Sequence, residues 1–453
     1  MALLAEFEDR WQKGSLDEGV RRLCQMATQP DRELARQGGD AIFRRLVEQM
    51  GDAFEPRLCD LYVCFFAKVL QYCRALPAAA WLDSRLQEFG LLTEEDLAGR
   101  ANRIRRGSRV APDPGRIRKI VVLSRVTLGA DVAVTSVVLR KMAQAFPAAS
   151  LVLVGGRKAA RLFAADSRVA ACPIEYPRGG GLLERLSAWP AVVEAIARET
   201  AGLEPAEYLI VDPDSRLTQL GMLPVTGHEP AYRFFESRSF AVATGGESLA
   251  ELTSAWLEQT CGDDSGGPIH PWVALPWKAA GWLPGHRWAS VSFGAGDNPR
   301  KRLPDPFEQR LLFALLEAGW RLVLDQGDGQ EELARAGGLL SGVRAAGRRV
   351  AEIEEASGPP PSDAEVVAWR GSLEGFGACI AESRLYVGYD SAGSHLAAAL
   401  GVPVIDIFAG FRWPRMPIRW RPCGPGPVTT IVVDPARHPD PDLILARVLE
   451  AAR

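Results

Sequence analysis

Apolar and polar positions follow two different patterns along the 453-residue chain. Up to about residue 115, apolar residues recur at helical spacing, as between Leu58 and Leu70, without alternating β-branched runs. From Ile117 onward, short apolar runs bounded by turn residues alternate with amphipathic stretches, which is typical of strands followed by helices. The pattern therefore predicts an all-helical segment followed by an α/β region.

The α/β region contains two series of alternating strands and helices. In the first series we expect strands at 119–124, 151–154 and 208–211, and helices at 132–146, 159–165 and 245–259. In the second we expect strands at 289–293, 321–325, 385–389 and 403–408, and helices at 306–318, 329–336 and 394–400. This alternation indicates two doubly wound, Rossmann-like domains in tandem. Open sheets of this kind bind ligands beyond the carboxyl ends of their strands, so we expect a binding cleft between the two sheets.

Linker composition sets the expected domain boundaries. A basic stretch with Gly and Pro, residues 100–115, follows the helical segment, and a stretch rich in Gly, Pro and Trp, residues 261–287, separates the two strand series. The expected domains are an all-helical domain at 1–115, a first α/β domain at 116–285 and a second at 286–453. The arginines of the first linker have two interpretations: a solvated face, or a contact with anionic lipid or an acidic acceptor.

Composition excludes several classes of protein. The net charge of −3 gives no basis for a nucleic-acid partner. No apolar stretch approaches the roughly 18 residues of a membrane helix, and acids occupy the N-terminus where a signal peptide carries basic residues, so we expect a cytoplasmic protein. Eight scattered cysteines form no C-x-x-C pair, which indicates reduced thiols that fill the core, and we expect no metal site.

The run from Leu385 to Gly401 reads as a buried strand, a turn and a helix with small and polar residues at its start. The first N–H groups of a helix lack intrahelical partners, and the helix dipole favours negative charge there. We therefore expect a phosphate cradle, consisting of Ser391, Ala392, Gly393, Ser394 and His395. Two roles for Asp390 and His395 remain open: ligand binding, or a His–Asp hydrogen bond that locks the loop.

A second stretch, residues 292–304, also follows an expected strand. Gly294 and Gly296 would permit close approach of the backbone to a diphosphate, and Lys301 would neutralise charge on a departing phosphate. The alternative is that the basic triplet around Lys301 is simply exposed to solvent.

Asp131 follows the first strand of the α/β region and begins the expected helix. It has two interpretations: an ordinary N-cap, or a carboxylate facing the cleft that accepts a proton from a sugar hydroxyl. The pair Asp212 and Asp214 has the spacing of a metal-binding D-x-D motif, but two acids after a strand are common turn residues, so we interpret them as turn residues.

In this order, the motifs resemble those of the ADP-heptose heptosyltransferases of lipopolysaccharide synthesis, glycosyltransferase family nine, which have the GT-B fold. The most specific part, residues 390–403, looks like the family signature D-[ST]-G-x-x-H-[LI]-x-A-A-x-G-x-P. Residues 128–147 look like the family opening L-G-D-V…L-R…F-P, with Ala130 inserted between Gly129 and Asp131. Residues 208–212, 301–304 and 420–422 also fall where the family has similar segments, so the resemblance spans about 117–435.

The resemblance implies an inverting, metal-independent glycosyltransferase without a cofactor. It would move a sugar from a nucleotide-diphosphate sugar such as ADP-heptose to a hydroxyl of a glycan, lipid or protein acceptor. Asp131 would be the general base, with Thr127 and Gly129 on the acceptor side, while Lys301 and the cradle bind the diphosphate. The first α/β domain would serve the acceptor and the second the nucleotide sugar. The helical domain would bind the acceptor or a partner protein, and the enzyme would work in the cytoplasm, free or at the inner face of the membrane.

Two other functions remain open. The turn altered by Ala130 suggests a catalytically silent GT-B module that binds nucleotide or glycan and acts as an interaction protein through its helical domain. A GT-B sugar-nucleotide epimerase would instead release nucleotide and an altered sugar without any acceptor.

Overall fold

The protein forms two compact units, each built on one parallel sheet, which confirms the predicted α/β architecture. The computed structural model describes residues 2–107, 111–240, 245–261, 270–279, 281–283, 285, 287–296, 298–355, 358–434 and 438–453. Unit 1 comprises residues 1–160, 167–247 and 251–269, and unit 2 comprises residues 161–166, 248–250 and 270–453.

The N-terminal part of unit 1, residues 2–107, is helical as predicted, and we call it the helical segment. Its longest helix buries one apolar face that includes Cys59 and Cys73, so these thiols fill the core as expected. The elements are α1 (Ala2–Gln12), α2 (Leu16–Ala27), α3 (Arg32–Ile42), the π turn η1 (Phe43–Val47), α4 (Glu48–Asp52), α5 (Pro56–Arg74), η2 (Pro77–Ala79), α6 (Ala80–Glu88) and α7 (Glu94–Arg105).

The sheet of unit 1 has the order β3-β2-β1-β4-β5 with all strands parallel. Its strands are β1 (Lys119–Leu123), β2 (Ser150–Gly155), β3 (Val169–Pro173), β4 (Tyr208–Asp212) and β5 (Tyr232–Phe234). Its helices are α8 (Leu128–Ala130), η3 (Asp131–Thr135), α9 (Ser136–Ala145), α10 (Arg157–Arg161), α11 (Leu182–Leu186), α12 (Ala188–Glu199), η4 (Pro205–Glu207), η5 (Glu229–Ala231) and α13 (Leu249–Cys261). The order reverses between β1 and β4, so the loops after these two strands lie side by side.

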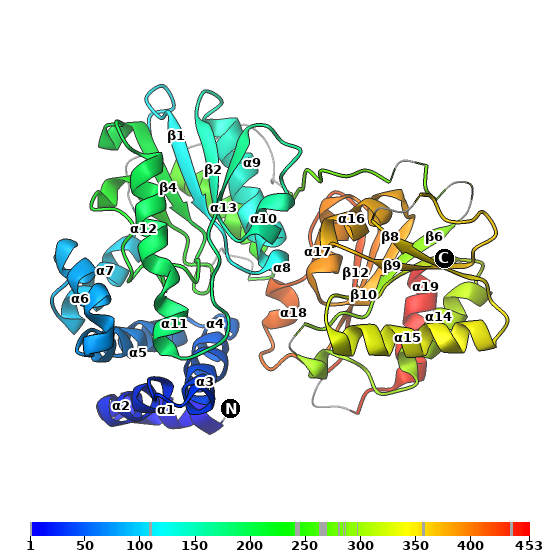
Figure 1. Ribbon diagram of the computed structural model, residues 1–453, viewed down its shortest axis with the longest axis horizontal. Coiled ribbons are helices and arrows are strands. Elements are labelled where there is room, and N and C mark those ends of the chain that lie inside the picture. Colours follow the sequence, from blue (N-terminus) through cyan, green and yellow to red (C-terminus); the bar gives the residue numbers. More distant parts are fainter. Residues whose placement is uncertain are drawn as a thin grey trace. The chain divides into compact units, whose positions relative to one another are not determined.

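The helical segment packs against this α/β part of unit 1 (Figure 1). Helix α7 contacts β5, and α3 contacts α11. Whether the helical segment folds as a separate domain with a boundary near residue 115 stays a prediction, and the linker residues 108–110 lie outside the described residues.

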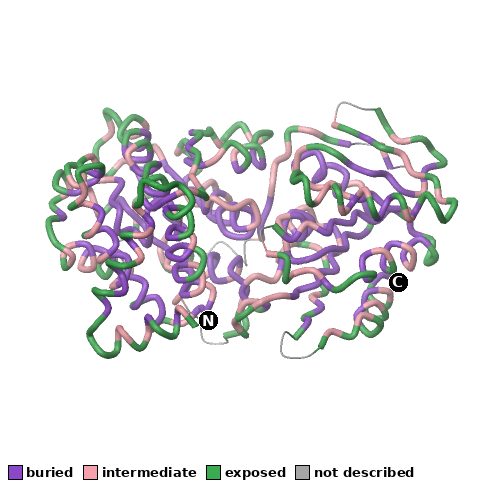
Figure 2. The backbone as a smooth tube through the Cα atoms, turned by 60° about the horizontal axis from the view of Figure 1, so that its bottom comes forward, coloured by how far each residue is buried: buried purple, intermediate pink, exposed green. Residues whose placement is uncertain are grey.

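The sheet of unit 2 has seven parallel strands in the order β12-β11-β10-β6-β7-β9-β8. They are β6 (Trp288–Ser292), β7 (Arg321–Asp325), β8 (Val350–Glu354), β9 (Val366–Arg370), β10 (Leu385–Tyr389), β11 (Val404–Phe408) and β12 (Val428–Val432). Its helical elements are η6 (Pro299–Lys301), α14 (Phe307–Glu317), α15 (Gln330–Ala345), α16 (Leu373–Glu382), α17 (Ala392–Ala399), α18 (Met416–Arg419) and α19 (Pro441–Ala451). An apolar core joins one face of the sheet to α14, α15 and α19, and the central strands of both sheets are buried (Figure 2). Here the order reverses between β6 and β10.

Sequence patterns located the central strands but missed five others. Four of these, β3, β5, β8 and β12, are the edges of the two sheets, and β9 lies next to the edge strand β8. Because edge strands are partly exposed, three of them carry polar or small residues rather than a continuous apolar run. Helix α15 continues nine residues beyond its predicted end at residue 336, through Ala345. The linker predicted at 261–287 is described only in part. Among the described residues, no helix is long and apolar enough to cross a membrane.

Candidate functional site

In unit 2 the predicted diphosphate residues come together where the strand order reverses. Lys301 lies in the loop after β6, and Asp390 follows the neighbouring strand β10. The Nζ atom of Lys301 donates to the backbone oxygen of Asp390 at 2.9 Å and lies 2.5 Å from its carboxylate. Lys301 is therefore not the solvent-exposed cation of the alternative interpretation, because its side chain is only 23% exposed.

The predicted phosphate cradle forms the first turn of α17. Ser391 is the N-cap, and its backbone N–H donates to the hydroxyl oxygen of Ser394 at 3.3 Å, while that hydroxyl donates to the Ser391 carbonyl at 2.9 Å. The Ser391 hydroxyl itself is buried and lies beside the buried hydroxyl of Tyr386. A bound anion would compete for this donor at the helix N-terminus.

Glycines near this turn serve two different purposes. A Cβ at Gly393 would lie 2.4 Å from the hydroxyl of Tyr386, so this glycine lets the helix pack closely on β10 rather than supplying an unusual backbone angle. Position 296, in contrast, requires glycine for its backbone angle, because its φ is +54°. Gly294 lines a small pocket beyond β6 and β7, together with Asp325 and Glu332.

The hydrogen bond between His395 and Asp390, one of the two roles left open by the sequence, is not formed. Their nearest atoms, Nε2 and Oδ1, are 3.9 Å apart, which is too long for a hydrogen bond. Burial lowers the pKa of His395 to about 4, although the Asp390 carboxylate opposes this shift. His395 is therefore neutral near pH 7, and its ring lies edge-on to Trp420 with the centroids 6.3 Å apart.

A second acid, which sequence reasoning missed, lies on the strand beside the Asp390 loop. Asp406 in β11 is fully buried, and its carboxyl group lies beside the Ser394 hydroxyl of the α17 turn. Burial raises its pKa well above the usual value, and the nearby Asp390 carboxylate raises it further. Burial and the Asp390 carboxylate thus favour the neutral form of Asp406, in which it adds no negative charge against a phosphate.

In unit 1, Asp131 is fully buried beside the carboxyl end of β1. Its Oδ1 atom accepts hydrogen bonds from the Arg125 backbone N–H and the Thr135 hydroxyl, each at 2.8 Å, and its Oδ2 atom accepts from the Ser124 hydroxyl at 2.8 Å. Burial raises the pKa of Asp131 to about 6, although these hydrogen bonds oppose the shift. The carboxyl group therefore changes charge close to neutral pH, as a general base should.

The interpretation of Asp131 as an N-cap is wrong, because the helix starts earlier. Thr127 occupies the N-cap position of α8, Gly129 lies in its first turn, and Asp131 has helical backbone angles. The next turn, η3, is a π turn in which the Ser136 N–H bonds to the Asp131 carbonyl. A π turn holds one residue more than an α turn, which is how a helix accommodates an inserted residue such as Ala130.

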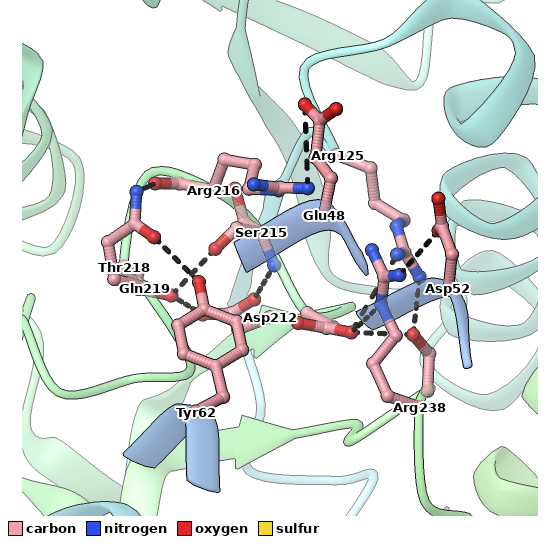
Figure 3. A network of polar contacts seen from close by, with 12 residues as sticks. Glu48, Asp52, Tyr62, Arg125, Asp212, Ser215, Arg216, Thr218, Gln219 and Arg238 are labelled. Carbon is pink, nitrogen blue, oxygen red and sulfur yellow. Dashed lines mark hydrogen bonds and ion pairs between the residues drawn. The ribbon is translucent and has the colours of Figure 1, made fainter. Parts of the chain in front are cut away.

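The two acids of the D-x-D sequence bind different partners. Asp212 accepts from the Ser215 backbone N–H and from the hydroxyls of Thr218 and Tyr232 (Figure 3). Asp214 has a φ of +66° and instead bonds Ser237 and Arg238. Both residues thus organise the turn after β4, as interpreted from the sequence.

Sequence reasoning missed the side chains that hold Asp131. Thr135 lies one helical turn after it, a spacing that could have indicated the contact. Ser124 and Arg125 are brought to it only because the chain turns back after β1, which no local pattern reveals.

Part of unit 2 is similar to a known protein family. Residues 291–438, which include Lys301 and the α17 turn, match the family model of glycosyltransferase family 9 (heptosyltransferase). No curated protein matches the chain significantly.

Solved structures match most of the chain at low identity. A glycosyl transferase family 9 protein from Veillonella parvula is 15% identical with a TM-score of 0.53, and the match covers 74% of this chain and 96% of that one. The E. coli heptosyltransferase WaaC with ADP is 16% identical, with 74% and 99% covered and a TM-score of 0.48. E. coli ADP-heptose lps heptosyltransferase II is 14% identical, with 74% and 98% covered and a TM-score of 0.47. At sequence identities this low, the likeness shows a shared fold only, and this fold is GT-B as predicted.

Proposed function

We propose that the chain transfers a sugar from a nucleoside-diphosphate sugar to an acceptor hydroxyl, because residues 291–438 match the family model of glycosyltransferase family 9 (heptosyltransferase). The reaction would invert the anomeric configuration and need no metal. ADP-heptose is the donor to test first, since solved heptosyltransferases that share the fold include one with ADP. The acceptor would be a hydroxyl of a glycan, lipid or protein.

The observation that carries this proposal is the polar surface at the start of α17. The Ser391 hydroxyl and the first N–H groups of the helix offer donors to a diphosphate. Lys301 lies beside them and would stabilise the charge that develops on the leaving nucleotide. When a diphosphate binds, Lys301 would divide its hydrogen bonds between Asp390 and the ligand.

Asp131 of unit 1 would take the proton from the acceptor hydroxyl while the hydroxyl oxygen attacks the anomeric carbon. Its pKa of about 6 suits this task, because the carboxylate predominates above pH 6 and is still basic enough to accept a proton. Turnover should therefore rise as the pH increases through about 6.

One observation favours the silent module as the second candidate. Asp131 has no exposed surface, and both of its oxygens already accept hydrogen bonds. A base must reach the proton that it removes, although catalytic hydrogen bonds often form only in the substrate complex. The two candidates differ in turnover, because a silent module binds the nucleotide but releases none from a donor sugar.

The first experiment is a thermal-shift panel of ADP, UDP, GDP and their sugars, since a ligand at a hundred times its Kd stabilises the native state by about 2.7 kcal/mol. The stabilising donor is then assayed for nucleotide release with and without acceptors. EDTA and the anomeric configuration of the product, read by NMR, test the metal-independent, inverting course. An altered free sugar formed without an acceptor would identify an epimerase.

Lys301→Ala should weaken binding of the nucleoside diphosphate roughly ten- to a hundredfold, because a hydrogen bond to a charged group contributes about 1.5–3 kcal/mol. Arg300→Ala is the matched control, since Arg300 is exposed on the same short helix. Equal affinities in the two variants would remove Lys301 from the donor site.

A further inference from the structure

Backbone strain in this protein is concentrated in one region of unit 1. Among the described residues, five non-glycine residues have positive φ, and they fall in three loops that surround the Asp131 turn and the end of α4: Phe54, Val126, Asp214, Gln219 and Leu220. Val126 is the most unusual, because a β-branched side chain rarely adopts this conformation. It lies between the Arg125 N–H and the helix that carries Asp131. Strained residues persist only where their surroundings hold them, and they gather at functional sites.

A buried cation holds the strained turn. The side chain of Arg125 is 3% exposed, and its Nη1 atom donates to the Ser237 hydroxyl at 2.8 Å. The Ser237 hydroxyl in turn donates to the Asp214 carboxylate at 2.6 Å, and that carboxylate lies 3.7 Å from Arg125. The backbone N–H of the same arginine donates to Asp131, so the position of this donor depends on the network around the side chain.

The network continues into the helical segment (Figure 3). Arg238 donates from Nε to Asp214 at 3.0 Å and from Nη1 to Asp52 at the end of α4 at 3.1 Å. Tyr62 of α5 donates to Gln219, a positive-φ residue, at 2.8 Å. The polar contacts thus run without interruption from Asp52 through Arg238 and Asp214 to the turn that holds Asp131.

We infer that the helical segment is a positioning element for Asp131, acting through Asp52, Arg238 and the buried Arg125. This inference rests on the proposed role of Asp131 as the base. It assigns the helical segment a task in the transfer reaction that is separate from acceptor or partner binding. The charged groups facing Arg125 are Asp131 from the helical turn η3, Asp214 and Arg216 from the loop after β4, and Arg238 from the loop after β5.

The first test changes the cation. Arg125→Met removes a positive charge near Asp131 and loosens the turn that supplies its backbone donor, and both effects raise the pKa of Asp131. We expect a rise of about half a unit or more, measured by NMR in protein labelled with ¹³C-carboxyl aspartate, with the resonance assigned from Asp131→Asn. The pH profile of donor turnover should move by the same amount, kcat should fall, and the KM for the donor should stay unchanged. Arg125→Lys keeps the positive charge, so the pKa of Asp131 should rise less in this variant than in Arg125→Met.

The second test starts from the far end of the network. Asp52→Asn should let the turn at residues 124–127 open more often, so that its amides exchange with solvent roughly tenfold faster, as followed by hydrogen exchange. Glu229→Gln is the matched control. Glu229 also joins the helical segment to the sheet, through Arg100 and Arg103, but it lies outside the network that reaches Asp131.

The outcomes separate the two proposals. If Asp131→Asn keeps its turnover, the proposed base is wrong. If Asp131→Asn is inactive but Asp52→Asn leaves the exchange of residues 124–127 unchanged, or speeds it no more than Glu229→Gln does, the positioning role is wrong and the base assignment stands. Should Arg125→Met fail to fold, Arg125→Lys and Asp52→Asn still decide the question.

Discussion

Replacing Asp131 with Asn should remove activity and yet stabilise the protein above pH 6. Burial raises the pKa of this carboxyl from 3.8 to about 6 in the folded protein. Each unit corresponds to 1.36 kcal/mol, so the ionised carboxylate costs about 3 kcal/mol of folding free energy at pH 7 and above. Because the pKa is higher in the folded than in the unfolded protein, the carboxyl group is neutral and this cost is absent below about pH 4. The corresponding folding stability is lost as the pH rises to about 6.

The Asn variant lacks this titration. Its amide oxygen can keep the hydrogen bonds from Arg125 and Thr135, which both go to Oδ1, while the bond from Ser124 to Oδ2 is lost at a cost of about 1 kcal/mol. The variant should therefore be less stable than the wild type by about 0.5 kcal/mol at pH 4 and more stable by about 2 kcal/mol at pH 8.

Urea unfolding of both proteins at a series of pH values measures this difference, and groups that titrate alike in the two proteins cancel. The signal should report unit 1, since two units need not unfold together. A difference of constant sign and size from pH 4 to pH 8 would refute the reasoning. General bases contribute about 10²–10⁴ to rates, so turnover of the variant should fall by at least about a hundredfold.

Two further predictions concern the helices that carry the proposed site. Gly393→Ala should cost about 1–3 kcal/mol of stability and weaken nucleotide binding, because its Cβ would meet the Tyr386 hydroxyl; adding Tyr386→Phe should restore most of both, as measured by denaturation and by thermal shift with ADP. Deleting Ala130 should convert the π turn η3 into an α turn, so that a crystal structure shows the Ser136 N–H bonded to the Val132 carbonyl, whereas a retained π turn would show that the insertion does not cause it.

Local chemistry made much of this fold predictable. The central strands are continuous apolar runs, because helices cover both faces of each sheet, and β1 and β10 were therefore evident. The half-exposed β12 gave no such signal. The turn before α17 could be located because small and polar residues directly follow a buried strand.

Other features depend on contacts that no local pattern encodes. Lys301 and Asp390 meet because β6 and β10 are neighbours in the sheet, an order that follows from the crossovers of the chain. The start of the helix at Thr127 was missed because Asp131 looks like a cap, and the earlier turn is made of Leu, Gly and Ala. The buried acid Asp406 was missed because its neighbours in β11 are apolar.

The link between Asp52 and Arg238 spans 186 residues of sequence, and that between Tyr62 and Gln219 spans 157. At a synthesis rate of about 5–20 residues per second, the second partner of each pair is made roughly 10–40 s after the first. During synthesis, Asp52 and Tyr62 must therefore remain without these partners until the later strands of the first sheet are made. A carboxylate and a phenol hydroxyl tolerate that delay, because water can hydrogen-bond both groups in the meantime.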